Sequence, residues 1–335
     1  MTHGWLIVDK PVGPGSTRIV GAVKRALHEG GYAKVKVGHG GTLDPLASGV
    51  LPIALGEATK LSGRMLDADK VYEFTIGFGV ETDTLDMEGE AVSTSDVRPS
   101  LAEVEAVLTR FTGEIEQVPP AYSALKVEGK RAYDLARAGE AVEMKARSVT
   151  VHELQIKKEE DPHPNLLPQA GEGAHRRTSR TSPSPACGRG QGEGLLLPST
   201  PLISVTLIAT VSKGTYIRSL ARDIARALGT VGHVTMLRRT RAGPFTLERA
   251  ISLDKLADLA KARRLEQALL PLTAGLDDIP ALPVTPDQAS RLRQGRTLAG
   301  IAAKPGLHLA TDESVPVALV ELSEGELRVV RGFNL

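Results

Sequence analysis

The sequence GHGGTLDPLASGVLPIALGEATK, residues 38–60, places one aspartate between a glycine-rich turn and a short apolar run. The glycines around His39 permit positive φ and leave space for another backbone or a ligand to come close. Pro45 holds the preceding Asp44 in an extended conformation, so its carboxylate is predicted to lie on a stiff bend and not on a helix. The run VLPIAL is predicted to be a short buried strand. Composition alone favours an ordinary turn residue that bonds to neighbouring backbone N–H groups.

Regular elements are predicted on both sides of this stretch. Residues 16–31 have the spacing of an amphipathic helix, capped by Ser16 or Thr17. Residues 71–80, VYEFTIGFGV, alternate as a strand with Tyr72 on its inward face, and an acidic turn, ETDTLDMEGE, follows. That inward face also carries Phe74, Ile76, Phe78 and Val80. The other elements predicted in this half are a strand over 6–10, a helix over 101–113 and a strand over 147–156.

Residues 159–200 differ in character from the rest of the chain. They are rich in Pro, Gly, Ser and Arg and lack periodicity, which predicts a disordered insertion. Strand alternation resumes over residues 203–211, so the insertion is expected at the tip of a β-hairpin, where a long loop costs little. The inward face of this second strand is predicted to hold Ile203, Val205, Leu207, Ala209 and Val211. The arginines of the insertion also allow a second interpretation, a basic arm that binds RNA.

Basic residues cluster in two segments after the insertion. Residues 214–229 are predicted to form a helix whose arginines recur every fourth position, and the segment HVTMLRRTRAGPF follows it. The two clusters comprise Arg218, Arg222, Arg226, Arg238, Arg239 and Arg241. They indicate either a solvated surface or a site for a polyanion such as RNA or DNA.

The composition of the whole chain limits its function class. The 335 residues, 41% of them hydrophobic, allow two domains or one large domain with an appendage. A formal charge of +1 means that a polyanion would be bound by local basic patches. The single cysteine, Cys187, excludes an intramolecular disulfide, and the histidines lack metal-ligand spacing. We expect a cytoplasmic protein, because neither an export signal nor a membrane-spanning apolar run is evident.

Four separated segments resemble the signature segments of the TruB family of tRNA pseudouridine synthases. They are GHGGTLDPLASGVLPIALGEATK, KVYEF, SKGTYIRSLARDIARALG and HVTMLRRTRAGPF, in the family's order and at similar spacing apart from the insertion. The resemblance extends from WLIVDKPVG to a C-terminal segment similar to a PUA RNA-binding domain, where residues 285–295 have the capping-box spacing of a helix and several short strands follow. It implies an α+β fold, with a mixed-sheet catalytic domain over residues 1–275 and a β-rich PUA-like domain over residues 280–335.

The resemblance also implies an activity. A TruB enzyme isomerises the uridine at position 55, in the T arm of tRNA, to pseudouridine, after flipping the base out of the RNA loop. It implies no metal or organic cofactor and no obligatory protein partner, and we expect a monomer. By similarity Asp44 is the catalytic nucleophile, which attacks the uracil ring or C1′, or assists formation of a glycal; the sequence leaves these routes open.

The other site residues follow from the same resemblance. His39 is similar to the histidine that occupies the vacated stack, Tyr72 to the tyrosine that stacks on the target ring, and Arg218 to the arginine that pairs with Asp44. Two further residues, Tyr216 and Leu237, resemble pocket-lining positions, and the phosphate contacts are assigned to Arg222, Arg226, Arg238, Arg239 and Arg241. Each has an ordinary explanation too: a loop-bonded histidine, a core tyrosine, a solvated arginine. Lys10 either approaches RNA, supports the active-site loop or faces solvent.

Two alternatives to a standalone enzyme remain from the sequence. One is an RNA-binding or tRNA-folding protein whose catalytic function is dispensable or lost. The other is a synthase that works in a complex with a guide RNA.

Overall fold

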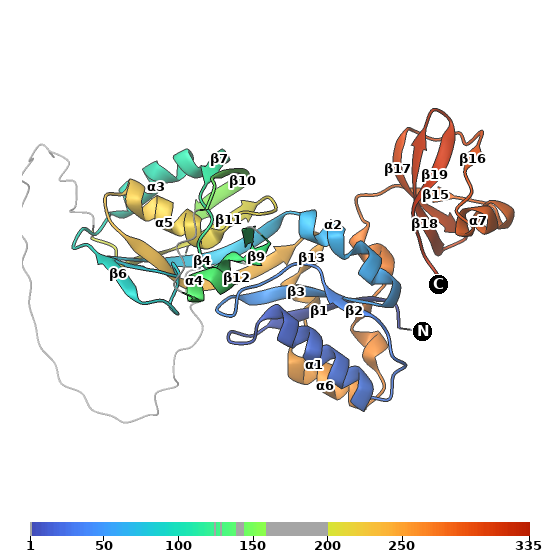
Figure 1. Ribbon diagram of the computed structural model, residues 1–335, viewed down its shortest axis with the longest axis horizontal. Helices are drawn as coiled ribbons and strands as arrows, with labels where there is room; N and C mark the ends of the chain where they lie inside the picture. The colour runs from blue at the N-terminus through green and yellow to red at the C-terminus, as the bar shows by residue number, and fades with distance from the viewer. Residues whose placement is uncertain (1, 124, 128, 139–143, 159–199) are drawn as a thin grey trace, which may run out of the picture.

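The computed structural model describes residues 2–123, 125–127, 129–138, 144–158 and 200–335. A ten-stranded mixed sheet forms the centre of the larger part (Figure 1). Its main path runs β14 (Leu269–Leu270), β1 (Gly4–Lys10), β3 (Ser48–Leu55), β12 (Gly232–Ala242), β4 (Lys70–Phe78), β11 (Ser204–Val211), β10 (Arg147–Ile156) and β7 (Gly113–Gln117). Two short strands join at the side, β2 (Val37–His39) on β3 and β13 (Phe245–Thr246) on β12. Because β12 is parallel to β3 and antiparallel to β4, the sheet is mixed, as expected.

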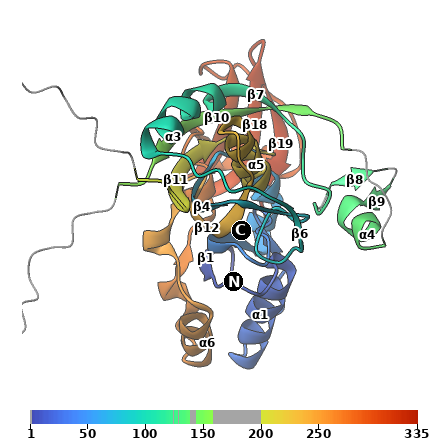
Figure 2. The same ribbon diagram turned by 90° about the vertical axis from the view of Figure 1, so that its left-hand side faces the viewer.

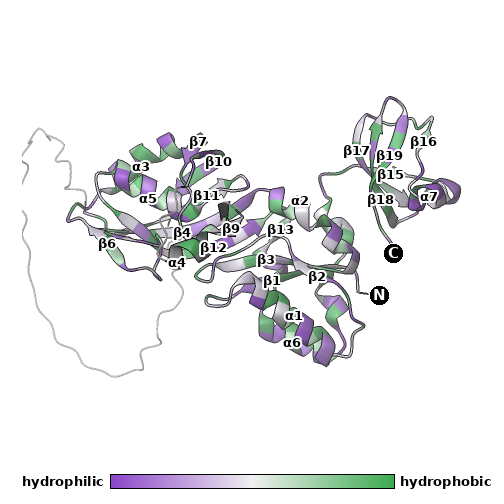
Figure 3. Ribbon diagram, viewed as in Figure 1, coloured by the Kyte–Doolittle hydropathy of each residue, from purple (hydrophilic) through white to green (hydrophobic). Residues whose placement is uncertain are grey.

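Two helix pairs cover one face of this sheet. The first pair is α1 (Ser16–Glu29) with α6 (Leu253–Lys261), and the second is α3 (Leu101–Leu108) with α5 (Ile217–Ala227). Both pairs contribute buried side chains to one core cluster with strands β1, β3, β4 and β11. Figure 2 shows α1 and α6 extending together from the same side of the sheet, and Figure 3 shows hydrophobic and hydrophilic positions interleaved around them. Amphipathic helices on one face of a sheet are the expected α+β arrangement.

The opposite face is covered by shorter elements. The 3-10 helix η1 (Gly56–Leu61), α2 (Ser62–Asp67) and η5 (Leu272–Gly275) pack there around Trp5, whose indole N–H donates to the Leu272 carbonyl at 3.2 Å. The other elements of the larger part are β5 (Val80–Thr82), β6 (Ala91–Thr94), η2 (Thr109–Phe111), β8 (Lys126–Val127), β9 (Lys130–Arg131), α4 (Ala132–Arg137), η3 (Leu247–Arg249) and η4 (Leu265–Gln267).

A smaller five-stranded sheet follows at the C-terminus. Its order is β15 (Ala281–Pro283), β17 (Gly306–Asp312), β18 (Val315–Ser323), β19 (Glu326–Gly332) and β16 (Leu298–Ala299), with α7 (Pro286–Arg293) against it. The predicted capping box is present, because Thr285 and Gln288 exchange hydrogen bonds. This sheet has a core cluster of its own, and Phe333, Leu309 and Leu319 join the cluster around Trp5.

Most predicted elements are confirmed, with three corrections. The helix predicted over 101–113 ends at Leu108 as α3, because η2 follows it and Gly113 already belongs to β7. The helix over 16–31 is α1, but Gly15 is its N-cap; Ser16 instead exchanges hydrogen bonds with the main chain of Leu43. Ile203 precedes β11 and is exposed, so it does not share the buried face of that strand. The insertion predicted over 159–200 lies outside the described residues except for its last position, but its flanking strands β10 and β11 pair antiparallel, as expected.

The contact between the two parts generates a stability prediction. Replacing the buried Phe333 with Ala is expected to lower the free energy of unfolding by about 3–5 kcal/mol, because it leaves a cavity in the core cluster that also contains Trp5. The matched control, Val330→Ala on exposed surface, should change it by about 0.5 kcal/mol or less. Urea unfolding followed by tryptophan fluorescence measures both, and equal effects would contradict the packing described.

Candidate active site

Asp44 lies in the loop between β2 and β3, and the loop is held on several sides. The Ser16 hydroxyl donates to the Leu43 carbonyl at 3.1 Å and accepts from the Leu43 amide at 2.8 Å. Beyond Asp44, the carbonyl of Pro45 accepts from the Gly13 amide at 2.8 Å and from Lys10 Nζ at 3.1 Å. A loop whose backbone is anchored on both sides of one residue keeps that side chain in place. The expected stiff bend at Asp44 is therefore confirmed.

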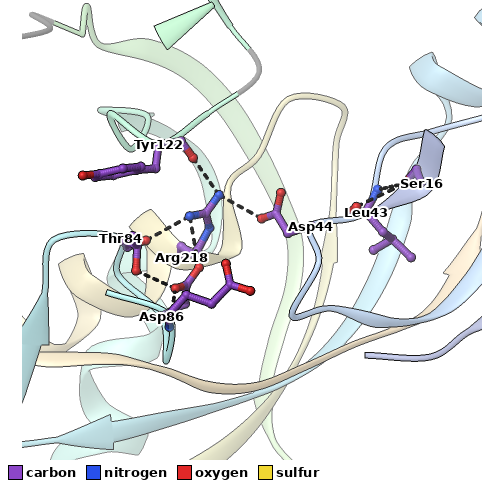
Figure 4. Close-up of polar contacts among 8 residues, drawn as sticks. Ser16, Leu43, Asp44, Thr84, Asp86, Tyr122 and Arg218 are labelled. Atoms are coloured by element: carbon purple, nitrogen blue, oxygen red, sulfur yellow. Dashed lines mark hydrogen bonds and ion pairs between the residues drawn. The ribbon is translucent and has the colours of Figure 1, made fainter. Parts of the chain in front are cut away.

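The carboxylate of Asp44 meets the guanidinium of Arg218. Arg218 Nη2 lies 2.9 Å from Asp44 Oδ2, and Figure 4 shows the arginine placed between Asp44 and Asp86. Arg218 Nη1 lies 3.2 Å from Asp86 Oδ2, so one cation serves two carboxylates. The guanidinium also donates to the carbonyls of Thr84, at 2.9 Å, and Tyr122, at 3.0 Å. A planar fork of donors used in this way fixes the orientation of the carboxylates it contacts.

The two carboxylates differ in their access to solvent. The side chain of Asp86 is 7% exposed, and its Oδ1 accepts from the Thr84 hydroxyl at 2.5 Å and from the Glu88 amide at 3.1 Å. The side chain of Asp44 is 39% exposed. Asp86 is therefore suited to hold Arg218, whereas Asp44 is the carboxylate that a ligand can reach.

A cavity of about 340 Å³ opens beside this ion pair, a size typical of small-molecule sites. Its lining includes the predicted residues Asp44, Tyr72, Tyr216, Arg218 and Leu237. They come from five places in the sequence: the 38–60 stretch, β4, the residue before α5, α5 itself and β12. The inward position predicted for Tyr72 is confirmed, since its ring packs against the core cluster at the cavity wall.

His39 does not line the cavity and lies at the end of β2, opposite Ile53 of β3. Burial, and secondarily the positive charge of Arg239, lower the pKa of His39 below its usual value of 6.5. Its imidazole is therefore neutral at physiological pH.

The arginines expected to contact phosphate divide into different groups. Arg241 and Arg226 are exposed, and Arg226 bonds to Glu81 at 2.7 Å. The half-buried Arg222 and Arg238 bond to Asp223 at 2.8 Å and Asp9 at 2.9 Å, respectively. The assignment of Arg239 to phosphate is wrong, because its side chain is 1% exposed and bonds to main-chain carbonyls inside the protein.

Sequence reasoning missed three contributors to the site. Asp86 was only one acid of a turn, and its role follows from the fold, which brings that turn to α5. Arg147 lies over the Tyr216 ring at 4.9 Å from its centroid and also lines the cavity. Gln117 exchanges hydrogen bonds with the main chain of Tyr216, at 2.8 and 3.1 Å, and so fixes the start of α5.

Of the interpretations open for Lys10, the structure selects loop support. The side chain is fully buried, and Nζ donates to the carbonyls of Pro11, Pro14 and Pro45. Burial lowers the pKa of Lys10 to about 8, against the opposing attraction of Asp44. Among the described residues, no group of three or more His, Cys, Asp or Glu could hold a metal ion, and no helix is long and apolar enough to cross a membrane.

A buried Asp–Arg pair and an exposed one are expected to contribute differently to the stability of this protein. Asp86→Ala leaves the 7% exposed Arg218 without one buried partner and should lower the free energy of unfolding by about 3–5 kcal/mol. The side chain of Asp278, which pairs with Arg64, is 67% exposed, so Asp278→Ala should lower the free energy of unfolding by only about 0–1 kcal/mol. Chemical denaturation of both variants tests this. Similar losses would mean that Asp86 does not carry the buried pair.

Comparisons with known proteins agree with this geometry. Residues 26–174 match the model for the TruB family pseudouridylate synthase N-terminal domain, and residues 218–277 match that for the tRNA pseudouridylate synthase B C-terminal domain. The tRNA pseudouridine synthase B of Novosphingobium aromaticivorans is 58% identical over 335 residues, covering 100% of this chain and 98% of the relative. That of Zymomonas mobilis is 55% identical over 332 residues, covering 99% and 96%.

Solved structures show the same fold. A chain in the crystal structure of a Cbf5-Nop10-Gar1 complex aligns with a TM-score of 0.66 and 26% identity, over 99% of this chain and 84% of that one. A chain in an H/ACA RNP bound to a substrate RNA containing 2'-deoxyuridine also aligns with a TM-score of 0.66, at 24% identity, over 99% and 86%. By its sequence matches over nearly its whole length, this chain belongs to the TruB family of pseudouridine synthases.

Proposed function

We propose that this protein isomerises the uridine at position 55, in the T arm of tRNA, to pseudouridine, with Asp44 as the nucleophile. The observation that carries the proposal is the partly exposed Asp44 carboxylate, held 2.9 Å from Arg218 at a cavity with an aromatic wall. The relatives named tRNA pseudouridine synthase B support the choice of substrate.

The proposed reaction uses a carboxylate in a confined site and involves no redox step. The bond between C1′ and N1 of the uracil breaks, the ring turns, and C1′ joins C5, while the proton on C5 leaves and N1 gains a proton. The result is an isomerisation, with no change in oxidation state. Asp44 attacks either the uracil ring or C1′, or assists formation of a glycal, and all three routes place the same side chain beside the same nucleoside.

The cavity residues take complementary roles in this proposal. The target base must leave its stack, at a cost of a few kcal/mol, before a carboxylate can reach it. Tyr72 then stacks on the flipped ring, with Tyr216 and Leu237 completing the walls of the cavity. Arg218 holds Asp44 in one orientation, and the neutral His39 occupies the space that the base has left.

The rest of the chain would bind the RNA around the flipped base. We assign the catalytic domain to residues 1–275 and a PUA-like RNA-binding domain to residues 280–335. Phosphate contacts are proposed for Arg222, Arg226, Arg238 and Arg241. In this proposal the enzyme acts in the cytoplasm as a monomer without an obligatory protein partner, unlike the Cbf5 chain that was crystallised with Nop10 and Gar1.

The substitution Asp44→Asn tests the nucleophile directly. Wild-type protein should release about one equivalent of tritium from a tRNA transcript labelled at uracil C5, and the variant should release none, because the amide is a poor nucleophile. The affinity of the variant for tRNA should stay near that of the wild type, and Asp278→Asn, at an exposed site, serves as the matched control. No release by the wild type despite tight binding would favour an RNA-binding or tRNA-folding protein.

Salt dependence tests the proposed phosphate contacts. If Arg241 contacts one phosphate, Arg241→Ala should reduce the slope of log K against log salt by about 1, since fewer counterions are released. Arg264→Ala, an exposed arginine after α6 that does not line the cavity, should leave the slope unchanged. Equilibrium binding of tRNA between low and moderate salt measures both slopes. Equal slopes in the wild type and Arg241→Ala would remove Arg241 from the proposed contacts.

A further inference from the structure

Arg239 is a buried cation whose role is not explained by the proposed phosphate contacts. Its side chain is 1% exposed, and within the described part of the chain its hydrogen bonds go to main-chain carbonyls. None of the ion pairs in that part of the chain includes it. Burying an arginine without a carboxylate partner is costly, so its retention calls for a specific explanation.

The carbonyls that Arg239 contacts lie on both sides of Asp44. Nη2 and Nη1 donate to Gly41 and Thr42, both at 3.3 Å, just before the aspartate. Nε donates to Val50 at 2.7 Å, just after it in β3. One guanidinium therefore joins the two ends of residues 41–50, the segment that carries the nucleophile. The planar fork of arginine presents its donors on three nitrogens in a fixed geometry, whereas the three donors of a lysine all radiate from one nitrogen at the end of a flexible chain.

The backbone of Arg239 is fixed as closely as its side chain. In the sheet it lies between Gly49 of β3, in parallel register, and Tyr72 of β4, in antiparallel register. Gly49 has φ +102°, and a Cβ at that position would lie 2.1 Å from the Arg239 carbonyl oxygen. Only glycine permits this approach. Arg239 thus connects the strand that follows Asp44 with the strand that carries Tyr72.

The positive charge of Arg239 affects the pKa of three neighbouring basic side chains. It contributes, after burial, to lowering the pKa of His39 and the pKa of Lys70, and it is one of the causes that lower the pKa of Lys10. Three neighbouring basic groups are thus less readily protonated because of it. A neutral side chain would avoid this repulsion, but it would leave the loop carbonyls without their donors.

We propose that Arg239 is a positioning residue, whose guanidinium sets the loop of residues 41–50 so that Asp44 meets Arg218 and the base stacked on Tyr72. The inference rests on the proposed function. A displacement of about 1 Å in a reacting group can slow a reaction by about 100-fold, and the 1% exposed Arg239 offers no surface for RNA to contact. Arg239 would therefore affect the chemical step and leave tRNA affinity unchanged.

The test compares Arg239→Lys, which keeps the charge, with Arg239→Met, which removes it. Single-turnover tritium release, tRNA affinity and melting temperature are measured for each. Both variants should slow the single-turnover rate by about 100-fold and change the dissociation constant for tRNA by less than about twofold. Leu256→Ala, which loses a buried contact in α6, is the control for lost stability: it should lower the melting temperature and keep the rate.

Three results would overturn the positioning role. The first is a wild-type rate in Arg239→Lys. The second is a loss of rate in the Arg239 variants that is accompanied by an equal loss of tRNA affinity. The third is an equal loss of rate in Leu256→Ala when its melting temperature is lowered to the same value as in the Arg239 variants. Gly41→Ala, which disturbs the same contact from the loop at φ +143°, is measured in parallel. A wild-type rate there overturns the role even where Arg239→Lys does not fold. An inactive wild type refutes the proposed function itself, whereas active wild type beside active Arg239→Lys refutes the positioning role alone.

Discussion

The ion pair between Asp44 and Arg218 is the contact on which the rest of the site depends. It joins a loop near the start of the chain to a helix more than half the chain away, at 2.9 Å. The cavity, its aromatic wall and the accessible carboxylate have a defined geometry only while this contact holds. Asp86 makes it possible, because its buried carboxylate contacts the same guanidinium and leaves Asp44 at the surface of the cavity.

The loop itself has no regular structure, and it is held by groups that come from elsewhere. Ser16 bonds to Leu43 from α1, Lys10 to Pro45 from β1, and Arg239 to Gly41 and Thr42 from β12. Buried carbonyls need donors, and an irregular loop cannot supply them from a ladder of its own. The neighbouring strands and helix thus supply the rigidity that an exposed carboxylate on a bend would otherwise lack.

Much of this arrangement could be predicted from the sequence, and the failures have physical causes. Periodicity identified the central strands, the inward Tyr72 and the amphipathic helices, because these follow from the repeat of each element. Asp86 could not be found, since an acid in a polar turn looks the same whether it meets solvent or a buried arginine. Ser16 was predicted as one of two possible helix caps, because a serine hydroxyl at the start of a helix commonly bonds to the helix backbone. Only the fold shows that this hydroxyl bonds to Leu43 instead.

The arginines of β12 show why residue type alone cannot assign a role. Arg239 and Arg241 are two positions apart and would share a face in a regular strand, yet one is buried and the other is exposed. The register of β12 against β4 shifts between these two residues. An extra residue at such a shift reverses the alternation of side chains, so Arg239 points beneath the Asp44 loop and Arg241 to the surface. A short basic run can therefore supply an internal support and an external charge at once, and which arginine does which is decided by one irregularity of the strand.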